Sequence, residues 1–367
     1  MIFVNIISSS LLIAGILAYK YFNPKKNINL LYILILVSIL PVINIFRPGT
    51  YESGDFNIHI YRSIEFYRSL SEGNIMPSWA GEVNANYGLP LFIFNYTLPY
   101  YLISLFHFLG FSFINSLKLF LAGSYIISGI FMFMFTKKIF KNDVSAFTSS
   151  VFYLFTPYHL IGLHFKVVIG ELFAFTMIPL LFFFIIKIRE SKQKIKSIVF
   201  AGLSFAALVA SHVFVALAAS IILVVFALFI SIKESNLKLF FKTLTALFIG
   251  ALISAYIWFT PFFMSQYTII ERIKLNFIPL ENVATLFYSP WRMGFLFQGP
   301  RGEIADLIGY TQCFVILFLI YQLITKKNLQ KTIVPVIFWL AIFAGLFFMI
   351  LPISKFVWEI FPFIKAV

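Results

Sequence analysis

The stretch IVFAGLSFAALVASHVFVALAASIILVVFALFISI, Ile198–Ile232, decides the fold class of this chain. It contains no Asp, Glu, Lys or Arg, and it is apolar on every face of a helix or a strand. A soluble helix keeps a polar side, so water cannot be the main solvent here. Only helices and closed barrels satisfy their backbone in hydrocarbon, and a membrane barrel would alternate polar and apolar residues. The stretch therefore predicts membrane-spanning α-helices.

Composition extends this prediction to the whole chain. Of its 367 residues, 61% are hydrophobic and 11% are charged, whereas roughly a quarter of a soluble domain is charged. Ten apolar segments are long enough to be expected spans: Ile2–Tyr19, Leu30–Phe46, Leu117–Thr136, Val144–Tyr158, Leu172–Ile186, Ile198–Ala210, Val213–Ile232, Leu244–Thr260, Leu307–Thr325 and Thr332–Leu351. We expect an all-α integral membrane protein, a polytopic bundle of about ten transmembrane helices forming a single domain over residues 1–367.

The loop charges predict the orientation. Thr97–Leu109 covers only about two thirds of a bilayer and is read as an interfacial helix, because a span there would put the later basic loops outside. The loops after alternate spans then hold 17 of the 28 basic and three of the 14 acidic residues, a net charge of +14, against zero on the other side. The positive-inside rule places the basic loops in the cytoplasm and both termini outside, in a multi-pass protein of the cell membrane. Orientation explains the positive charge better than nucleic-acid binding does, so no nucleic-acid partner is expected.

With this orientation, the long polar segments all lie on the outer face. They are Arg47–Asn115, Tyr158–Glu171 and Pro261–Asp306. Interfacial helices are expected in the first of them, with Tyr100 and Tyr101 in an aromatic belt at the membrane surface. Function is therefore sought on the outer face.

The first outer loop contains a predicted surface helix, SGDFNIHIYRSIEFYRSL, Ser53–Leu70. At 3.6 residues per turn, three polar side chains share one face: Asp55, His59 and Arg62. Apolar side chains take the opposite face: Phe56, Ile60, Ile64 and Tyr67. A structural alternative stays open, in which Asp55 caps the helix and Arg62 pairs with Glu65.

Seven segments carry a family resemblance. In chain order they are GDFNIHIYR, MPSW, NYGLPLFIFNYTLPYYLISLFHFLG, HFKVVIGEL, ASHVFVAL, LISAYIWFTPFF and LFYSPWRMG. Together they resemble the membrane proteins described as 6-pyruvoyl-tetrahydropterin synthase-related, which are similar to GT-C glycosyltransferases, and the resemblance runs from Ser53 to the end of the chain. Pterin chemistry is not expected, because the five histidines are scattered and form no compact metal-binding cluster.

The resemblance implies a glycosyltransferase with its active site at the extracytoplasmic face and a polyprenyl-phosphate-linked sugar as donor. It implies that Asp55 is the base or a metal ligand, and that Glu171 meets a metal or the acceptor. Whether Mg or Mn binds is left open, since no second aspartate follows Asp55 at metal-binding spacing. Relatives continue with further helices, so the chain is expected to be C-terminally incomplete.

Substrate binding is predicted for five side chains on the outer face: His59, Arg62, Lys166, His212 and Arg301. Cationic groups suit a leaving phosphate, and arginine binds phosphate bidentately. Plainer interpretations stay open for several of them. Lys166 can extend to the headgroups of membrane lipids while Glu171 caps its helix, His212 can bond backbone, and Arg301 can bind anionic lipid.

Two other functions compete with glycosyl transfer. A transporter or a flippase of lipid-linked precursors would share the basic inner loops, although transporters usually carry ionisable residues at mid-membrane and repeated halves. Here the spans are nearly free of charge and no repeat is visible. An inactive GT-C-like scaffold is the third interpretation, because a fold does not establish an activity.

The charge asymmetry yields a topological prediction. Cysteines introduced at Ser191 and Asn328 should be shielded from a membrane-impermeant thiol reagent in intact cells, whereas cysteines at Ser71 and Gly299 should react. Labelling of the Ser191 position from outside would reverse the orientation.

Overall fold

The computed structural model describes residues 2–190, 194–268, 283–287, 308–325 and 333–360. Their regular structure is helical, apart from one β-bridge between Ala80 and Leu89. The predicted all-α class is therefore confirmed. The chain divides into two compact units, Met1–Phe155 with Gly162–Phe263 and Thr156–Ile161 with Met264–Val367.

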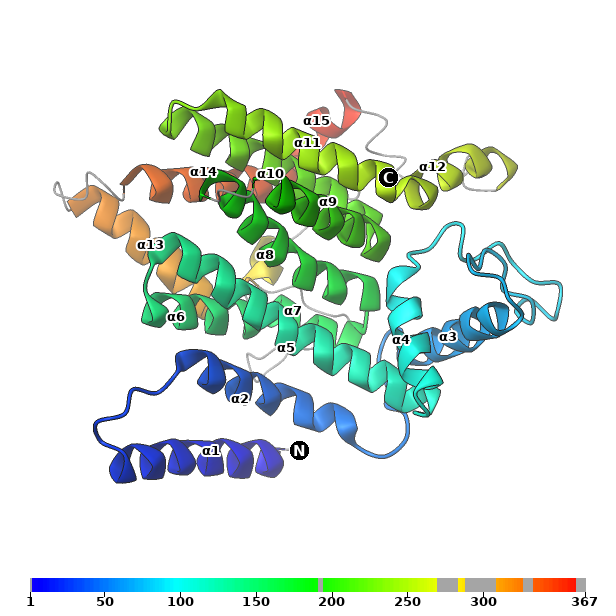
Figure 1. The fold of residues 1–367 in the computed structure, drawn as a ribbon, viewed down its shortest axis with the longest axis horizontal. Helices are drawn as coiled ribbons and strands as arrows, with labels where there is room; N and C mark the ends of the chain where they lie inside the picture. Colours follow the sequence, from blue (N-terminus) through cyan, green and yellow to red (C-terminus); the bar gives the residue numbers. More distant parts are fainter. Residues whose placement is uncertain (1, 191–193, 269–282, 288–307, 326–332, 361–367) are drawn as a thin grey trace. The chain divides into compact units, whose positions relative to one another are not determined.

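The first unit contains most of the helices (Figure 1). Their bounds are α1 Ile2–Phe22, α2 Leu30–Val42, η1 Ile43–Phe46, α3 Phe56–Ser71, α4 Leu98–Phe108, α5 Phe113–Phe140, α6 Asp143–Leu154, η2 Gly162–Lys166, α8 Ile169–Glu190, α9 Lys194–Ser211, α10 Val213–Lys233, α11 Leu237–Ile253 and α12 Ala255–Met264. Along the centre of this unit α5, α8, α9 and α11 pack each against the next, while α3 and α4 lie beyond one end of α5.

The second unit contains shorter elements. They are α7 Pro157–Ile161, η3 Ser265–Tyr267, η5 Val283–Leu286, α13 Tyr310–Thr325, α14 Ile333–Ile350, η6 Pro352–Ser354 and α15 Lys355–Ile360. Most of the predicted outer segment Pro261–Asp306, including Arg301, lies outside the described residues.

Helix length separates the predicted spans into two groups. Among the described residues, four helices are long and apolar enough to cross a membrane: α5, α8, α9 and α10. The bent pair α11 and α12 makes a fifth if it is one span. Four other predicted spans correspond to the shorter apolar helices α1, α2, α13 and α14, and the predicted span Val144–Tyr158 corresponds to α6, which has 12 residues. With 11 residues, α4 is also among the shorter apolar helices, and its interfacial location stays a prediction.

The predicted continuous span Leu244–Thr260 is wrong in one respect, because the helix bends by 60° where α11 meets α12. Side chains satisfy backbone carbonyls at this break. The Ser254 hydroxyl donates to the Gly250 carbonyl at 2.9 Å, and the Trp258 indole donates to the Ala251 carbonyl at 2.9 Å. Such substitutes let a helix break where the backbone still finds partners.

The buried side chain of Lys118 fixes the start of the first outer loop. It lies on α5, is 1% exposed, and donates to the carbonyls of Arg47 at 2.5 Å and Gly49 at 2.6 Å. A buried ammonium is costly without such acceptors. This residue therefore ties the loop that leads into α3 to a long helix.

A close approach between α9 and α11 depends on glycine. A Cβ on Gly250 would lie 2.5 Å from the Gly202 carbonyl oxygen and 2.9 Å from the Phe205 Cβ. Small residues let membrane helices pack backbone to backbone, where dispersion and polar contacts replace the missing hydrophobic drive.

We expect Gly250→Ala to destabilise the protein by about 1–3 kcal/mol, the usual cost of overpacking, because a backbone oxygen must move aside. The measurement is thermal unfolding in detergent. Gly123→Ala on α5 is the matched control, since a Cβ there meets no heavy atom within 4 Å. Equal melting temperatures for the two variants would show that the α9–α11 contact is not tight.

Candidate functional site

Backbone hydrogen bonds join the two segments predicted to form the first and second outer loops. The Gly54 N–H donates to the Phe165 carbonyl at 2.7 Å, and the Asp55 N–H donates to the Lys166 carbonyl at 3.0 Å. Residues 162–166 form a single π-helical turn, a feature frequent at functional sites. Two candidate residues that lie over a hundred positions apart in the sequence are thus neighbours in the structure.

The next residue, Val167, has a strained backbone. Its φ is +54°, in the left-handed region that a β-branched side chain rarely adopts, and its side chain is fully buried. Its N–H donates to the Gly162 carbonyl at 3.0 Å, which closes the π-turn. Strain of this kind, about 1–3 kcal/mol, persists only where surrounding structure enforces it, and it concentrates at functional sites.

The Asp55 carboxylate is not used to cap its helix. Asp55 occupies the N-cap position of α3, but its side chain makes no capping hydrogen bond. The Ser53 hydroxyl takes this role instead, accepting from the Phe56 N–H at 3.1 Å. The capping interpretation of Asp55 is therefore wrong, and this half-buried carboxylate can serve another purpose.

The structure also replaces the proposed pairing of Arg62 with Glu65. The buried Glu65 pairs with Arg68 at 3.2 Å and accepts from the Glu82 N–H at 2.9 Å. Arg62 is half-buried and instead hydrogen-bonds the Tyr100 hydroxyl. Its guanidinium thus lies next to the tyrosines at the start of α4.

His59 holds two tyrosines of this cluster. Its Nδ1 lies 2.9 Å from the Tyr100 hydroxyl and its Nε2 lies 3.4 Å from the Tyr96 hydroxyl. The Val167 backbone lies close enough to the ring to affect its pKa. With one tyrosine at each nitrogen, the neutral imidazole donates to one hydroxyl and accepts from the other. The imidazole therefore connects α3 to α4 and to the strained turn.

The predicted faces of α3 need correction at this residue. His59 and Phe56 are both 0% exposed and share the buried side of the helix, whereas Ile58 and Tyr61 face outward. Helical periodicity places residues three apart on one face, and the packing of α4 decides which face is covered. The observed partners of the His59 ring are other side chains of this chain, so its contact with a substrate stays a prediction.

Burial and Arg62 set the protonation of the cluster. Burial, together with the positive charge of Arg62, lowers the pKa of His59 to about 3. Burial raises the pKa of Tyr100, a rise that the charge and hydrogen bond of Arg62 oppose. His59 is therefore neutral and Tyr100 protonated at neutral pH, as their hydrogen bond requires.

Tyr96 brings the third element into the cluster. Its ring stacks on His212 with centroids 5.9 Å apart, and its hydroxyl accepts from the Gly170 N–H. A Cβ on Gly170 would lie 2.7 Å from the Tyr96 ring and would collide with the Ser211 carbonyl. Glycine at this position thus lets α4, α8 and α9 converge.

His212 also makes the backbone contact that its plainer interpretation predicts. It caps α10, with Nδ1 accepting from the Val215 N–H at 3.4 Å. Burial lowers the pKa of His212, while the negative charge of Glu171 raises it. Glu171 lies in the first turn of α8, where a carboxylate complements the helix dipole, so both residues have structural roles beside any catalytic one.

Sequence reasoning missed the central tyrosines. Tyr100 is fully buried and Tyr96 stacks on it at 5.9 Å, so assigning Tyr100 to an interfacial belt is wrong. Tyr101 is more exposed and donates to the Ile75 carbonyl at 2.6 Å. The available signal was the four-residue spacing of Tyr96 and Tyr100, which puts two aromatic rings on one side of a helix start.

The described part of the chain contains no group of three or more His, Cys, Asp or Glu side chains that could hold a metal ion. Asp55 and Glu171 do not form such a set within it, so no step through Mg or Mn is derived. The remaining predicted residue, Lys166, is half-buried in the π-turn.

The depressed pKa of His59 gives the protein a predictable acid sensitivity. The unfolded histidine titrates near 6.5 and the folded one near 3, so only the unfolded chain gains this proton between those values. The free energy of unfolding should therefore decrease as the pH is lowered through that window, by up to about 1.4 kcal/mol per pH unit. In His59→Gln, thermal midpoints measured between about pH 7.5 and 5 should decline less steeply than in the wild type. An identical decline would mean that His59 is not buried in its neutral form.

Comparison with known proteins places the chain in a family. A curated relative, an uncharacterized protein of Lactococcus lactis subsp. cremoris (strain MG1363), is 24% identical over 316 residues, which cover 83% of this chain and 51% of the relative. The chain thus spans about half the length of the curated relative it matches. Residues 94–364 match the family described as "6-pyruvoyl-tetrahydropterin synthase related domain; membrane protein". Because the match covers most of the sequence, the chain belongs to this family of membrane proteins.

Proposed function

We propose that this protein is a membrane glycosyltransferase that transfers a sugar from a polyprenyl-phosphate donor at the outer membrane face. The observation that carries the proposal is the pair of backbone hydrogen bonds that sets Asp55 beside Lys166. The residues that bear a carboxylate and an ammonium are neighbours there, next to a strained π-turn. Glycosyl transfer needs both, a base for the acceptor and a cation for the departing phosphate.

In the proposed reaction, the carboxylate acts on the acceptor hydroxyl and the cationic groups act on the leaving phosphate. The acceptor hydroxyl oxygen attacks the anomeric carbon, its proton passes to the Asp55 carboxylate, and the bond from that carbon to the donor phosphate oxygen breaks. The leaving polyprenyl phosphate carries the electron pair of the broken bond. Lys166 and Arg62 offset this charge, and Arg301 is a further proposed phosphate contact.

This arrangement is supported by three neighbouring side chains, those of His59, Tyr96 and Tyr100. A neutral His59 fixes both tyrosines, and Tyr100 in turn bonds Arg62. A guanidinium positioned by such a partner loses less freedom on binding phosphate. His212 and Glu171, which approach through Tyr96, are proposed to border the acceptor.

The finer architecture belongs to the same proposal. We infer a GT-C-like bundle of about ten transmembrane helices, with α3 and α4 as interfacial helices of the first outer loop. The charge asymmetry of the loops supports an extracytoplasmic site. The location of α3 and α4 beyond one end of α5 agrees with helices at the membrane surface (Figure 1).

One observation favours a second candidate, a flippase of lipid-linked precursors. The 60° bend between α11 and α12 resembles the broken helices of transporters, which place irregular backbone at a substrate path. A flippase would move labelled donor across proteoliposome membranes without forming a glycosylated product. Translocation without transfer would select this candidate.

The decisive variant is Asp55→Asn. Removal of the charge should lower turnover at least about a hundredfold, the usual scale for loss of a general base. The side chain caps nothing, so folding should be unaffected. The measurement is transfer from a panel of radiolabelled polyprenyl-phosphate sugars by purified protein, with thermal stability in the same detergent.

Glu72→Gln is the matched control for this experiment. It removes one carboxylate from the other end of the same helix, at the C-cap of α3, and should keep both turnover and stability. Near-normal transfer by Asp55→Asn would exclude Asp55 as the base and direct the search to Glu171.

A further inference from the structure

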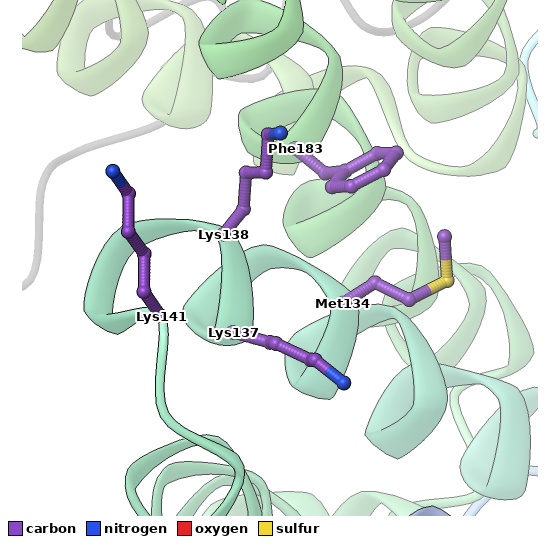
Figure 2. A pocket seen from close by; sticks show the side chains of 5 residues that line it. All are labelled: Met134, Lys137, Lys138, Lys141 and Phe183. Carbon is purple, nitrogen blue, oxygen red and sulfur yellow. The ribbon is translucent and has the colours of Figure 1, made fainter.

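A pocket lies at the C-terminal end of α5, the end farthest from the cluster of His59, Tyr96 and Tyr100. It is lined by Met134, Lys137, Lys138 and Lys141 of α5 and by Phe183 of α8, and its volume is about 560 Å³ (Figure 2). Three of its five lining side chains are cationic and two are apolar. We propose that this pocket binds an anionic phospholipid, with the headgroup phosphate at the lysines and an acyl chain against Met134 and Phe183.

The backbone at the end of α5 presents the lysines together. Lys141 takes a left-handed conformation with φ of +52°, and its N–H donates to the Lys137 carbonyl at 2.8 Å. This ends the helix abruptly, so that Lys138 and Lys141 extend in the same direction (Figure 2). Two ammonium groups on one side of the pocket suit a phosphate, which accepts several hydrogen bonds.

The charges around the pocket leave a positive excess. Lys137 forms an ion pair with Asp143 at 2.8 Å, both side chains being about half exposed. A fourth cation, Lys187, lies 5.0 Å from the centroid of the Phe183 ring that forms the wall. These four lysines give the pocket region a positive character, which favours an anion.

The apolar wall argues for a lipid over a free anion. Phe183 is 8% exposed and Met134 is half-buried, so both belong to the packed surface between α5 and α8. Free phosphate would gain nothing from this wall, whereas an acyl chain packs against it. Basic pockets between transmembrane helices bind anionic headgroups in this way.

The test uses native mass spectrometry of the full chain in detergent, titrated with dioleoyl phosphatidylglycerol or dioleoyl phosphatidylcholine. The wild type should retain the anionic lipid preferentially. Lys138→Gln combined with Lys141→Gln should weaken that binding at least about tenfold, since each lysine near an anionic lipid contributes roughly fivefold. Unchanged thermal stability would show that the variant folds.

A matched pair of substitutions separates the pocket from general surface charge. Lys238→Gln with Lys242→Gln removes the same charge from α11, away from the lining residues, and should leave phosphatidylglycerol binding unchanged. Equal weakening in both variants, equal retention of phosphatidylcholine, or displacement of the lipid by millimolar inorganic phosphate would each overturn the proposal. Sugar transfer plays no part in this readout, so the result is independent of the proposed glycosyltransferase activity.

Discussion

The structure depends on one constraint, that backbone polar groups in hydrocarbon must find partners within the protein. The long apolar segments meet it as helices, and the stretch Ile198–Ile232 in α9 and α10 does so without a charged residue. Where the helix breaks between α11 and α12, Ser254 and Trp258 supply the missing donors. Polar chemistry is thereby confined to the ends of helices and the segments between them.

This confinement explains how the outer cluster is built. Three chain segments contribute to it, and one buried residue positions each of them. Lys118 holds the entry to α3, His59 connects α3 to the start of α4, and Gly170 allows Tyr96 to approach α8 and α9. Half-buried charges such as Asp55 and Arg62 remain at the surface of this scaffold, where a substrate can reach them.

The two ends of α5 illustrate the same physics with opposite results. At one end, carboxylates, imidazoles and tyrosines accompany the basic groups, as proton transfer requires. At the other, the lysines of the pocket, of which Lys137 pairs with Asp143, suit the binding of an anion without chemistry. α5 thus separates the proposed site of sugar transfer from the proposed lipid-binding pocket.

The sequence by itself determined the helical class, the location of several spans and the residue types available for chemistry, because hydrophobicity and charge are properties of single residues. It could not decide that Ser53 rather than Asp55 caps α3, or that His59 faces inward with Phe56. The burial of Tyr100 and the neighbouring positions of Asp55 and Lys166 also needed the tertiary structure. These features depend on contacts between segments far apart in the chain, and periodicity within one helix carries no information about which neighbour covers it.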